Sequence, residues 1–452
     1  MSYTHRYLAR VVLEAETPLC ISTGKRNGNT QSPVIKDING LPYIPSSSMA
    51  GVLRHAIGEE NAKMIFGFQD RSNNTTYGSK AIFTDGVMIG KEGIALDGIQ
   101  EIDFTDEFYR HYQNLPVRHH VKISQKGAGV DKGKYDHEVV YKGTRFVAEI
   151  IILSDGTNEA FFNSIINRLR DSTFALGGKT RRGIGKMKVQ QCEKAILNLT
   201  VKKDLDDFLG KSASLSEPFS RYTKTDATPI ASEGWTNYTL ELEPEDYILF
   251  RASVSDDNRY AQPVVESYIK WSDGKPKFID GCVLIPGSSI KGAISHRTAF
   301  HWNRLGNLYA EGTVHPVGDD NQAVTSIFGV IKKSYENKLI TKRGNCLIPD
   351  IIEEAPLAEE DKKVFNHVSI DRLTGGALQT ALFSENAVYR KGHRYSLEIL
   401  VKESALKGPN IREAFEAALK DLKNGMLPLG GLTNHGYGVF TGTLKKNGEE
   451  LV

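Results

Sequence analysis

The stretch Leu176-Gly177-Gly178-Lys179-Thr180-Arg181-Arg182-Gly183-Ile184-Gly185 decides how this chain folds, because it occurs again as Leu429-Gly430-Gly431-Leu432-Thr433-Asn434-His435-Gly436-Tyr437-Gly438. The glycine pairs and the threonine keep their places in both copies. A second segment, IPSSSMAG at 44–51, returns as IPGSSIKG at 285–292. Two matches in the same order predict two similar modules, joined head to tail, that share one task.

Around these repeats, each module has the same expected order of elements: strand, helix, strand, strand, helix and a closing strand. The periodicity of apolar residues predicts strands over Tyr7–Glu16, 238–243, Val139–Leu153 and Ala387–Val401, and helices over Met49–Ile57, Ile290–Trp302, Ala160–Leu169 and Ile411–Leu422. This order is that of an α+β, ferredoxin-like (RRM-like) fold, in which two helices cover one face of an antiparallel sheet. The other face is left open, and such a face commonly meets RNA. We expect a first module over 1–202, a linker over 203–234 and a second module over 235–452, with an insertion near 304–324.

The composition is that of an ordinary globular protein of 452 residues, long enough for two or three domains. The formal net charge is only +2, so any binding of a polyanion must come from lysines and arginines that are concentrated locally. The four cysteines are far apart and form no CxxC pair, which argues against a disulfide framework and a structural zinc site. The chain shows no signal region at its start and no run of about 18 apolar residues, so we expect a cytoplasmic protein without a membrane partner.

The two glycine loops can be interpreted either as phosphate-binding loops or as simple tight turns. Glycines at this spacing permit positive φ and let successive backbone amides approach one anion or a sugar-phosphate chain. In the first copy Lys179, Arg181 and Arg182 add positive charge, whereas Leu432, Asn434 and His435 in the second copy predict weaker phosphate binding. The alternative is a tight turn that needs glycine for backbone reasons alone, but the repetition beside serine-led helices favours the functional reading.

The serine-led helix starts are expected to bind phosphate, because a helix N-terminus offers free amides and a positive dipole end. Ordinary helix capping by the hydroxyls is the alternative, and both readings can hold together. Arg54, further along the first helix, is also expected to contact RNA. The full set at the two helix starts is Ser46, Ser47, Ser48, Arg54, Ser288, Ser289 and Lys291.

Each module also carries a charged middle region that predicts a protruding β-hairpin, since strand-like arms flank a glycine-containing tip. The arms begin near Arg118 and Asn366, and the tips lie at 127–133 and 374–376. A basic hairpin can lie along nucleic acid or wedge between bases. An exposed hairpin without a partner is the alternative. The residues expected to contact RNA from these hairpins are His119, His120, Lys122 and Arg372.

Taken together, these motifs resemble the RAMP superfamily of CRISPR-associated proteins, most of all the repeating backbone subunits of type III effector complexes. The resemblance rests on 32–48, on the hairpin with its Lys142-Gly143-Thr144-Arg145-Phe146 segment, on the glycine loop and on their counterparts in the second module. It implies a tandem fusion of two backbone units, with hairpin thumbs, that binds CRISPR guide RNA, target RNA and other effector subunits. Base pairing would then read the sequence while the protein holds the backbone.

Backbone subunits of this family often cut target RNA with an aspartate placed two residues before a proline, assisted by a divalent metal. The first module has Gln31 at that place and is expected not to cleave, because an amide cannot replace a carboxylate as base or ligand. The second module has Ala261 there, with Asp256 and Asp257 just upstream. These two are the candidate catalytic and metal-binding residues, with Mg²⁺ or another divalent cation as cofactor. A simple Asp-rich turn is the alternative, and Asp371 is a weaker candidate.

Three functions therefore remain open from the sequence: a guide-binding subunit that also cleaves, a scaffold without chemistry, and a metal-independent endoribonuclease that processes precursor RNA. The third would use His119, His120 or His435 as the acid-base catalyst. It is the least favoured, since none of these histidines pairs with a lysine or tyrosine in a visibly catalytic arrangement.

Overall fold

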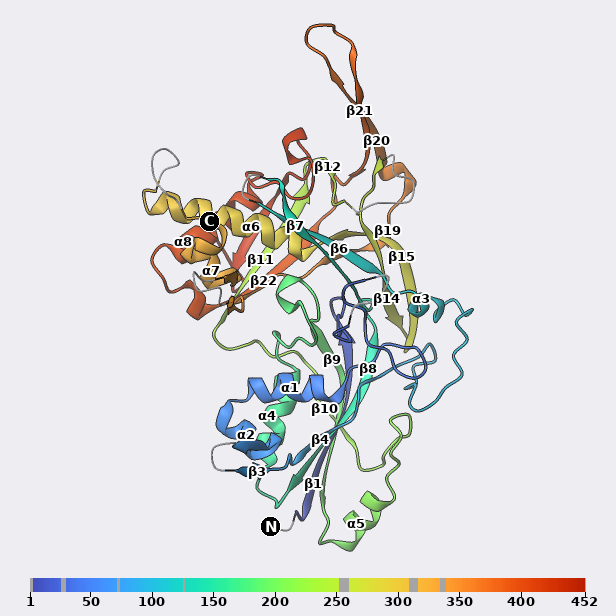
Figure 1. The fold of residues 1–452 in the computed structure, drawn as a ribbon. Helices are drawn as coiled ribbons and strands as arrows, with labels where there is room; N and C mark the ends of the chain where they lie inside the picture. The colour runs from blue at the N-terminus through green and yellow to red at the C-terminus, as the bar shows by residue number, and fades with distance from the viewer. Residues whose placement is uncertain are drawn as a thin grey trace.

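The computed structural model describes residues 3–25, 30–70, 74–124, 127–251, 260–308, 316–333 and 339–451 (Figure 1). Up to residue 225 its helices and strands are β1 (His5–Ala15), α1 (Ser46–Ala56), α2 (Glu59–Phe66), β2 (Phe68–Asp70), β3 (Thr75–Tyr77), β4 (Ala81–Phe83), β5 (Val87–Met88), α3 (Arg110–Gln113), β6 (Val117–Ile123), β7 (Gly129–Glu138), β8 (Arg145–Ser154), α4 (Glu159–Leu169), the 3₁₀ turn η1 (Thr180–Arg182), β9 (Met187–Asn198), α5 (Lys202–Leu209) and β10 (Thr223–Thr225).

From residue 235 the elements are β11 (Trp235–Pro244), β12 (Tyr247–Ile248), β13 (Tyr260–Ala261), β14 (Val265–Ser272), β15 (Lys275–Ile285), α6 (Gly287–Leu305), η2 (Gly318–Asp320), α7 (Gln322–Phe328), β16 (Val330–Lys333), β17 (Leu339–Lys342), β18 (Cys346–Leu347), β19 (Ile351–Pro356), η3 (Glu359–Asp361), β20 (Lys362–Ile370), β21 (Ala377–Tyr389), β22 (Tyr395–Lys402), η4 (Glu403–Leu406), α8 (Ile411–Lys423), η5 (Thr433–His435), β23 (Phe440–Lys446) and β24 (Glu449–Glu450).

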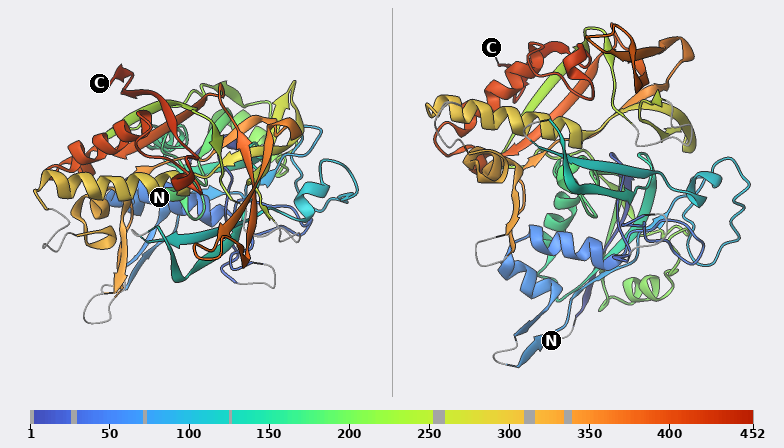
Figure 2. Two further views of the ribbon diagram at one scale, coloured as in Figure 1. Left: turned by 90° about the horizontal axis from the view of Figure 1, so that it is seen from above. Right: turned by 45° about the horizontal axis from the view of Figure 1, so that its top comes forward.

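Both halves have an α+β architecture with an antiparallel main sheet. The first sheet has the order β10-β9-β1-β8-β4, and the second has β18-β22-β11-β23-β24. In the first half the core lies between the sheet and helices α1 and α4, where Tyr7 stacks on Phe162 with 5.7 Å between ring centroids. In the second half α6 and α8 lie side by side over the sheet (Figure 2).

Two predicted strands were too long. The continuous strands expected over 139–153 and 387–401 are divided, because tight turns at Gly143 (φ 87°) and Gly392 (φ 86°) separate β8 and β22 from the hairpins before them. A reversal with positive φ suits glycine and ends the strand. The helices also begin earlier than expected, at Ser46 and Gly287.

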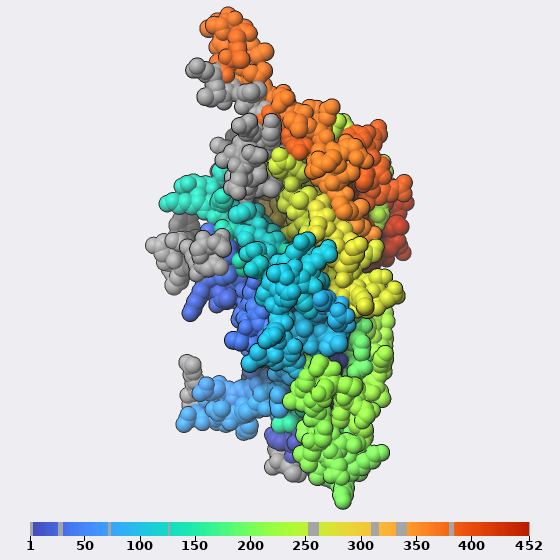
Figure 3. Space-filling model, turned by 90° about the vertical axis from the view of Figure 1, so that its right-hand side faces the viewer, coloured from blue at the N-terminus to red at the C-terminus, as the bar shows by residue number. Residues whose placement is uncertain are grey.

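The prediction of an open sheet face is wrong for the first module. Leu8 and Leu197 on that face are fully buried beneath Phe208, Phe219 and Tyr222, which belong to the segment expected to be a linker. That segment contains α5 and β10, and β10 adds an edge strand to the sheet. Figure 3 shows it covering the lower part of the molecule.

The second sheet leaves its outer face more accessible, but the side chains there do not suit RNA. Residues that alternate with the buried ones of β11 include Glu241 and Glu243, and Glu398 of β22 accepts a hydrogen bond from Asn237 at 2.9 Å. Carboxylates repel phosphate. The exposed Lys402 and Lys445 also lie on this face, so its charge is mixed, while the corresponding face of the first sheet is covered.

The two modules share a continuous junction. Strands β14, β15 and β19 form a three-stranded sheet against the first module, where Ile269 joins the first core. The indole nitrogen of Trp271 donates a hydrogen bond to the carbonyl of Gly143 at 2.7 Å, and Phe278 stacks on His111 with 3.8 Å between ring centroids. An interface with buried apolar and polar contacts of this kind holds the modules in one orientation.

The two hairpins differ in their surroundings. Strands β20 and β21 extend away from the rest of the molecule (Figures 1 and 3), whereas β6 and β7 lie across the second module near α6. Arg118, at the base of β6, is only 8% exposed and makes a bidentate ion pair with Glu266 at 2.6 Å and another with Asp350. The first hairpin is therefore fixed at its base, because this arginine pairs with carboxylates of the second module, while most of its residues further out are exposed.

Candidate nucleic-acid interface

The two glycine loops have the same backbone. Positive φ occurs at Gly177, Lys179, Gly183 and Gly185 in the first loop, and at the four corresponding positions of the second, which are Gly430, Leu432, Gly436 and Gly438. A Cβ added at Gly185 would lie 2.2 Å from the carbonyl oxygen of Leu176, and one at Gly438 would lie 1.8 Å from that of Leu429. The turn therefore needs glycine for steric reasons in both modules. The alternative interpretation, that these glycines serve the backbone, is correct whether or not the loop also binds a ligand.

The first loop lies at the junction of the modules. A Cβ added at Gly183 would lie 2.7 Å from Oδ1 and 2.9 Å from the backbone nitrogen of Asp350, which belongs to the second module. Arg181 places its guanidinium 5.5 Å from the ring centre of Trp235, at the start of the second module. The loop is thus held by residues that lie far away in the sequence.

A cluster of five cations surrounds this loop, and we call it the junction cations. Lys179, Arg181 and Arg182 come from the loop, Lys291 comes from α6, and Arg343 follows β17. Among the described residues, none of the five forms an ion pair with a carboxylate at 4.0 Å or less. Burial, and then the charge of Arg343, lowers the pKa of Arg181 to about 10. Burial also lowers the pKa of Lys291, with Arg182 and Arg181 adding to the effect. Such mutual repulsion is relieved when an anion binds.

Two of the junction cations have neutral partners that fix their position. The guanidinium of Arg182 donates a hydrogen bond to the hydroxyl of Tyr135 at 2.6 Å and lies 5.0 Å from the centre of that ring. The ammonium of Lys291 donates to the carbonyl of Phe328 at 3.3 Å. Hydroxyl and carbonyl oxygens orient a cation without neutralising it, so both side chains keep their charge for a ligand.

An aromatic stack stands beside the cations. His120 stacks on Tyr135 and on His137, with 4.9 and 4.8 Å between the ring centroids. His137 is fully buried and neither ring nitrogen has a hydrogen-bond partner. Burial first, and then the positive charge of Lys179, lowers the pKa of His137 to about 2. Burial and Arg118 lower that of His120 to about 4, so both rings are neutral at pH 7.

The helix starts are capped in a way that the sequence did not predict. Neither α1 nor α6 has a cap from its serine side chains, since Pro45 and Pro286 occupy the N-cap position. The first amides, those of Ser46 and Gly287, each donate to a distant carboxylate at 2.7 Å, which belongs to Asp85 in the first module and Asp350 in the second. An aspartate already holds the place expected for phosphate, so the prediction of an anion site at these N-termini is wrong at the first amide.

The remaining predicted residues are spread around the junction. His119 and Ser289 are exposed, while the hydroxyl of Ser288 lies 3.5 Å from Nδ1 of His120. Lys122 is exposed and 4.0 Å from Asp319 of the expected insertion. The side chains of Ser47 and Ser48 are not brought to the first loop by any described contact, and Arg54 donates to the carbonyl of Phe66 at 3.3 Å.

The second loop has a different set of neighbours. His435 is exposed, and among the described residues it belongs to a group with His367 and Glu385 whose nitrogen and carboxylate oxygen atoms lie within 4.8 Å of one another. A Cβ added at Gly436 would meet nothing within 4 Å. Arg372 is exposed in the turn between β20 and β21. The second loop is therefore open at Gly436, whereas the first loop is enclosed at the corresponding Gly183.

The candidate catalytic residues Asp256 and Asp257 lie outside the described residues. The weaker candidate, Asp371, is a turn residue, because its Oδ1 accepts hydrogen bonds from the amides of Leu373 and Thr374 and from the Thr374 hydroxyl at 2.7 to 3.0 Å. These bonds lower its pKa. Leu373 and Thr374 therefore fix the orientation of this carboxylate.

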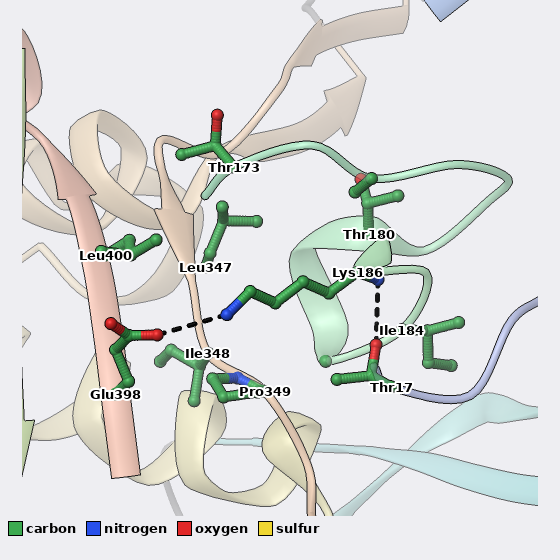
Figure 4. A pocket seen from close by; sticks show the side chains of 12 residues that line it. Thr17, Thr173, Thr180, Ile184, Lys186, Leu347, Ile348, Pro349, Glu398 and Leu400 are labelled. Carbon is green, nitrogen blue, oxygen red and sulfur yellow. Dashed lines mark hydrogen bonds and ion pairs between the residues drawn. The ribbon is translucent and has the colours of Figure 1, made fainter. Parts of the chain in front are cut away.

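A small cavity lies at the junction (Figure 4). Thr17, Thr180 and Lys186 from the first module face Leu347 and Glu398 from the second, and Lys186 bridges Glu398 and Glu16 at 3.2 Å each. Its volume of about 30 Å³ admits a water molecule but no nucleotide. The candidate interface is therefore the surface of the junction, and not an enclosed pocket.

Several residues of this site were missed from the sequence. Tyr135, Asp350 and Arg343 become neighbours of the first loop only through the fold, and no spacing signal in the chain announces them. The pairing of Arg118 with Glu266 joins positions 148 residues apart. The sequence did point to the basic residues of 179–182, to Lys291 and to His120.

Among the described residues, no helix is both long and apolar enough to cross a membrane. No curated protein matches the chain at a significant level. The family model of the RAMP superfamily matches it twice, over residues 12–188 and 268–441, which together make up more than half of its length. Each matched region contains one of the two glycine loops, and the chain therefore belongs to the RAMP superfamily.

Proposed function

We propose that this protein is a backbone subunit of a type III CRISPR ribonucleoprotein that binds guide RNA along the junction of its two modules. Membership of the RAMP superfamily suggests a CRISPR-associated RNA-binding subunit. The observation that carries the proposal is the set of junction cations, which come from both modules and have no carboxylate partner among the described residues. A phosphate chain is the ligand that such a set fits best.

The chemistry of the cluster favours contact with the RNA backbone over contact with the bases. Lysine and arginine beside a glycine-rich turn bind phosphate oxygens, and backbone amides of such a turn can add further donors. Gly177 and Gly178 are exposed at the start of the first loop, next to Lys179, although the amide of Gly178 already donates to the carbonyl of Cys20 at 2.8 Å. Bases held in this way remain free to pair with a complementary strand.

The topology supports a ferredoxin-like module repeated twice. The strands follow the order β9-β1-β8-β4 in the first module and β23-β11-β22-β18 in the second, each with two helices on one face. The extended hairpin β20–β21 is suited to act as a thumb across a guide-target duplex. The first hairpin lies instead beside the junction cations, where His119 and Lys122 would face the same strand.

Cleavage of target RNA in the second module is a separate proposal, which rests on the sequence alone. Asp256 and Asp257 would bind Mg²⁺ and orient a ribose 2′-hydroxyl toward the adjacent phosphate. In the assembled ribonucleoprotein, the double variant Asp256→Ala/Asp257→Ala is expected to lose one cut in the target RNA and to keep guide binding. Cutting that is unchanged at every position would leave a scaffold without chemistry.

The alternative of a histidine-dependent processing endoribonuclease receives less support. A histidine with a pKa of about 4, as at His120, holds no proton to donate at neutral pH. This alternative predicts cleavage of hairpin RNA by the isolated protein in the presence of a chelator, with loss of activity in His435→Ala.

The experiment that tests the proposal is purification of the protein with its native partners, followed by sequencing of the bound RNA. We expect short RNAs that share one repeat-derived end. An assembled particle that contains no RNA would contradict the proposal.

A further inference from the structure

We propose that His367, Glu385 and His435 form a binding site for a divalent metal ion of the zinc class, at the place where the second hairpin meets the second glycine loop. The proposal does not depend on RNA binding. It concerns a set of residues separate from Asp256 and Asp257, and it assigns the metal by the chemistry of its ligands.

Three elements bring the ligands together. His367 lies on β20, Glu385 on the neighbouring strand β21, and His435 on the 3₁₀ turn η5 of the glycine loop. Nε2 of His367 is 3.0 Å from Oε1 of Glu385, and the rings of His367 and His435 have centroids 5.4 Å apart. One ligand atom from each residue lies within 4.8 Å of the other two.

The state of Glu385 points to a missing ligand. Its side chain is 1% exposed, and its Oε2 atom is buried without a hydrogen-bond partner. A buried carboxylate oxygen that lacks a partner is costly, since it loses water and gains nothing in return. A cation bound between Glu385 and the two imidazoles would supply the partner.

The surroundings would also strengthen such a site. Tyr247, Phe365 and Tyr437 pack around the base of the hairpin, with 5.2 to 5.9 Å between ring centroids. An apolar shell lowers the local dielectric and orients the ligands. Burial, and then a hydrogen bond to the Glu385 carboxylate, raises the pKa of Tyr437, so this neutral hydroxyl leaves the negative charge of Glu385 for a cation to balance.

The donor set selects the class of metal. Two imidazole nitrogens and one carboxylate oxygen suit zinc and its neighbours among the transition metals, whereas Mg²⁺ prefers oxygen ligands and water. Tetrahedral zinc with bonds near 2.1 Å needs ligand atoms about 3.4 Å apart, so a pair separated by the full 4.8 Å must close by about 1.4 Å. His435 can make this adjustment, because it lies exposed beside Gly436, which has open space around it.

Three protein ligands leave a coordination position open to water, as zinc sites that perform chemistry do. Among the described residues of the first module, no equivalent group occurs. His137 is buried at the base of the first hairpin, and the adjacent carboxylate of Asp136 points to the Thr30 hydroxyl and the Gln31 amide at 2.7 Å instead. The site is therefore a property of the second module alone.

The test uses the full chain, stripped of metal with a chelator and titrated with Zn²⁺ in a calorimeter and with Co²⁺ in an absorption spectrometer. We expect one tight site per chain, a Co²⁺ spectrum typical of low coordination number, and no comparable heat with Mg²⁺. His435→Ala and Glu385→Gln should each weaken Zn²⁺ binding at least about tenfold.

The matched control is His393→Ala, because His393 is also an exposed histidine of the second module but lies on the turn before β22. Its Zn²⁺ affinity should equal that of the unaltered chain. Circular dichroism checks the fold of Glu385→Gln, and His435→Ala alone decides the matter if that variant is unfolded. The proposal is overturned if the unaltered chain binds no Zn²⁺ at micromolar concentration, or if His435→Ala binds as tightly as His393→Ala.

Discussion

The two glycine loops show how a duplicated backbone can acquire two environments. Their φ angles match position by position, and both need glycine where the chain crosses its own carbonyls. The first loop is enclosed by the second module and carries or contacts five cations. The second loop is open at Gly436, and its His435 lies beside His367 and the buried Glu385. The backbone was retained for steric reasons, and the side chains around it diverged.

Among the changes considered, removal of Arg118 should lower the free energy of unfolding most, because this arginine fixes the first hairpin to the second module. Arg118→Ala leaves Glu266 and Asp350 buried without their cation, and breaking a buried ion pair in this way costs about 3–5 kcal/mol. Denaturant titration of the full chain measures the loss.

Two controls accompany this variant. Arg372→Ala removes an exposed arginine of the second hairpin and should change the free energy of unfolding very little. Adding Glu266→Gln to Arg118→Ala should recover part of the loss, because it removes one of the stranded charges. Equal stability of Arg118→Ala and Arg372→Ala would show that the junction does not depend on this pair.

The matched glycines test the enclosure of the first loop directly. Gly183→Ala and Gly436→Ala both force a side chain into positive φ, at 86° and 89°. Only the first also meets backbone atoms of Asp350 and Ile348, at 2.9 and 3.0 Å. We expect Gly183→Ala to be less stable than Gly436→Ala by about 1–3 kcal/mol, the usual cost of overpacking. A Gly436→Ala variant that is equally unstable would contradict the enclosure.

A smaller effect is expected from pH, through the buried histidine of the first module. The folded-state pKa of His137 is about 2, below its ordinary value of 6.5, so the folded state binds fewer protons than the unfolded state between these values. Stability from this group is complete above pH 6.5 and is lost as the pH falls, by up to about 1.4 kcal/mol per pH unit.

Denaturant titrations at about pH 7.5 and about pH 5 measure this loss. His137→Phe keeps a ring in the stack but cannot take up a proton, so its stability should fall less between the two pH values. His393→Ala, which alters an exposed histidine, should behave like the unaltered chain. The assignment is wrong if His137→Phe and the unaltered chain lose the same amount.

The sequence predicted those parts of the structure that depend on local pattern. The repeat, the α+β class and the helices near 160–169 and 411–422 follow from spacing that is visible within about ten residues, and the structure has α4 at Glu159–Leu169 and α8 at Ile411–Lys423. The sequence did not reveal the two aspartates that accept hydrogen bonds from the helix starts, because they are distant along the chain. Asp85 lies 39 residues from Ser46, and Asp350 lies 63 residues from Gly287.

The same reason explains the errors in the site. The sequence predicts phosphate binding at Ser46, but the amide of Ser46 donates to Asp85. It also predicts an open face on the first sheet, which Phe208, Phe219 and Tyr222 cover. His367, Glu385 and His435 carry no spacing signal, since a hairpin and a loop bring them together only in the folded chain.

The measurement that tests the central claim most directly is the salt dependence of single-stranded RNA binding by loop variants of the full chain. Lys179→Gln/Arg182→Gln removes two junction cations, and Leu432→Ala/Asn434→Ala is a control that changes two uncharged residues of the second loop. If the junction binds the RNA backbone, the first variant should bind more weakly, and its negative slope of log affinity against log salt should be shallower by about 1.4. The second variant should keep the slope of the unaltered chain. Equal affinity and an equal slope for the first variant and the unaltered chain would contradict the account.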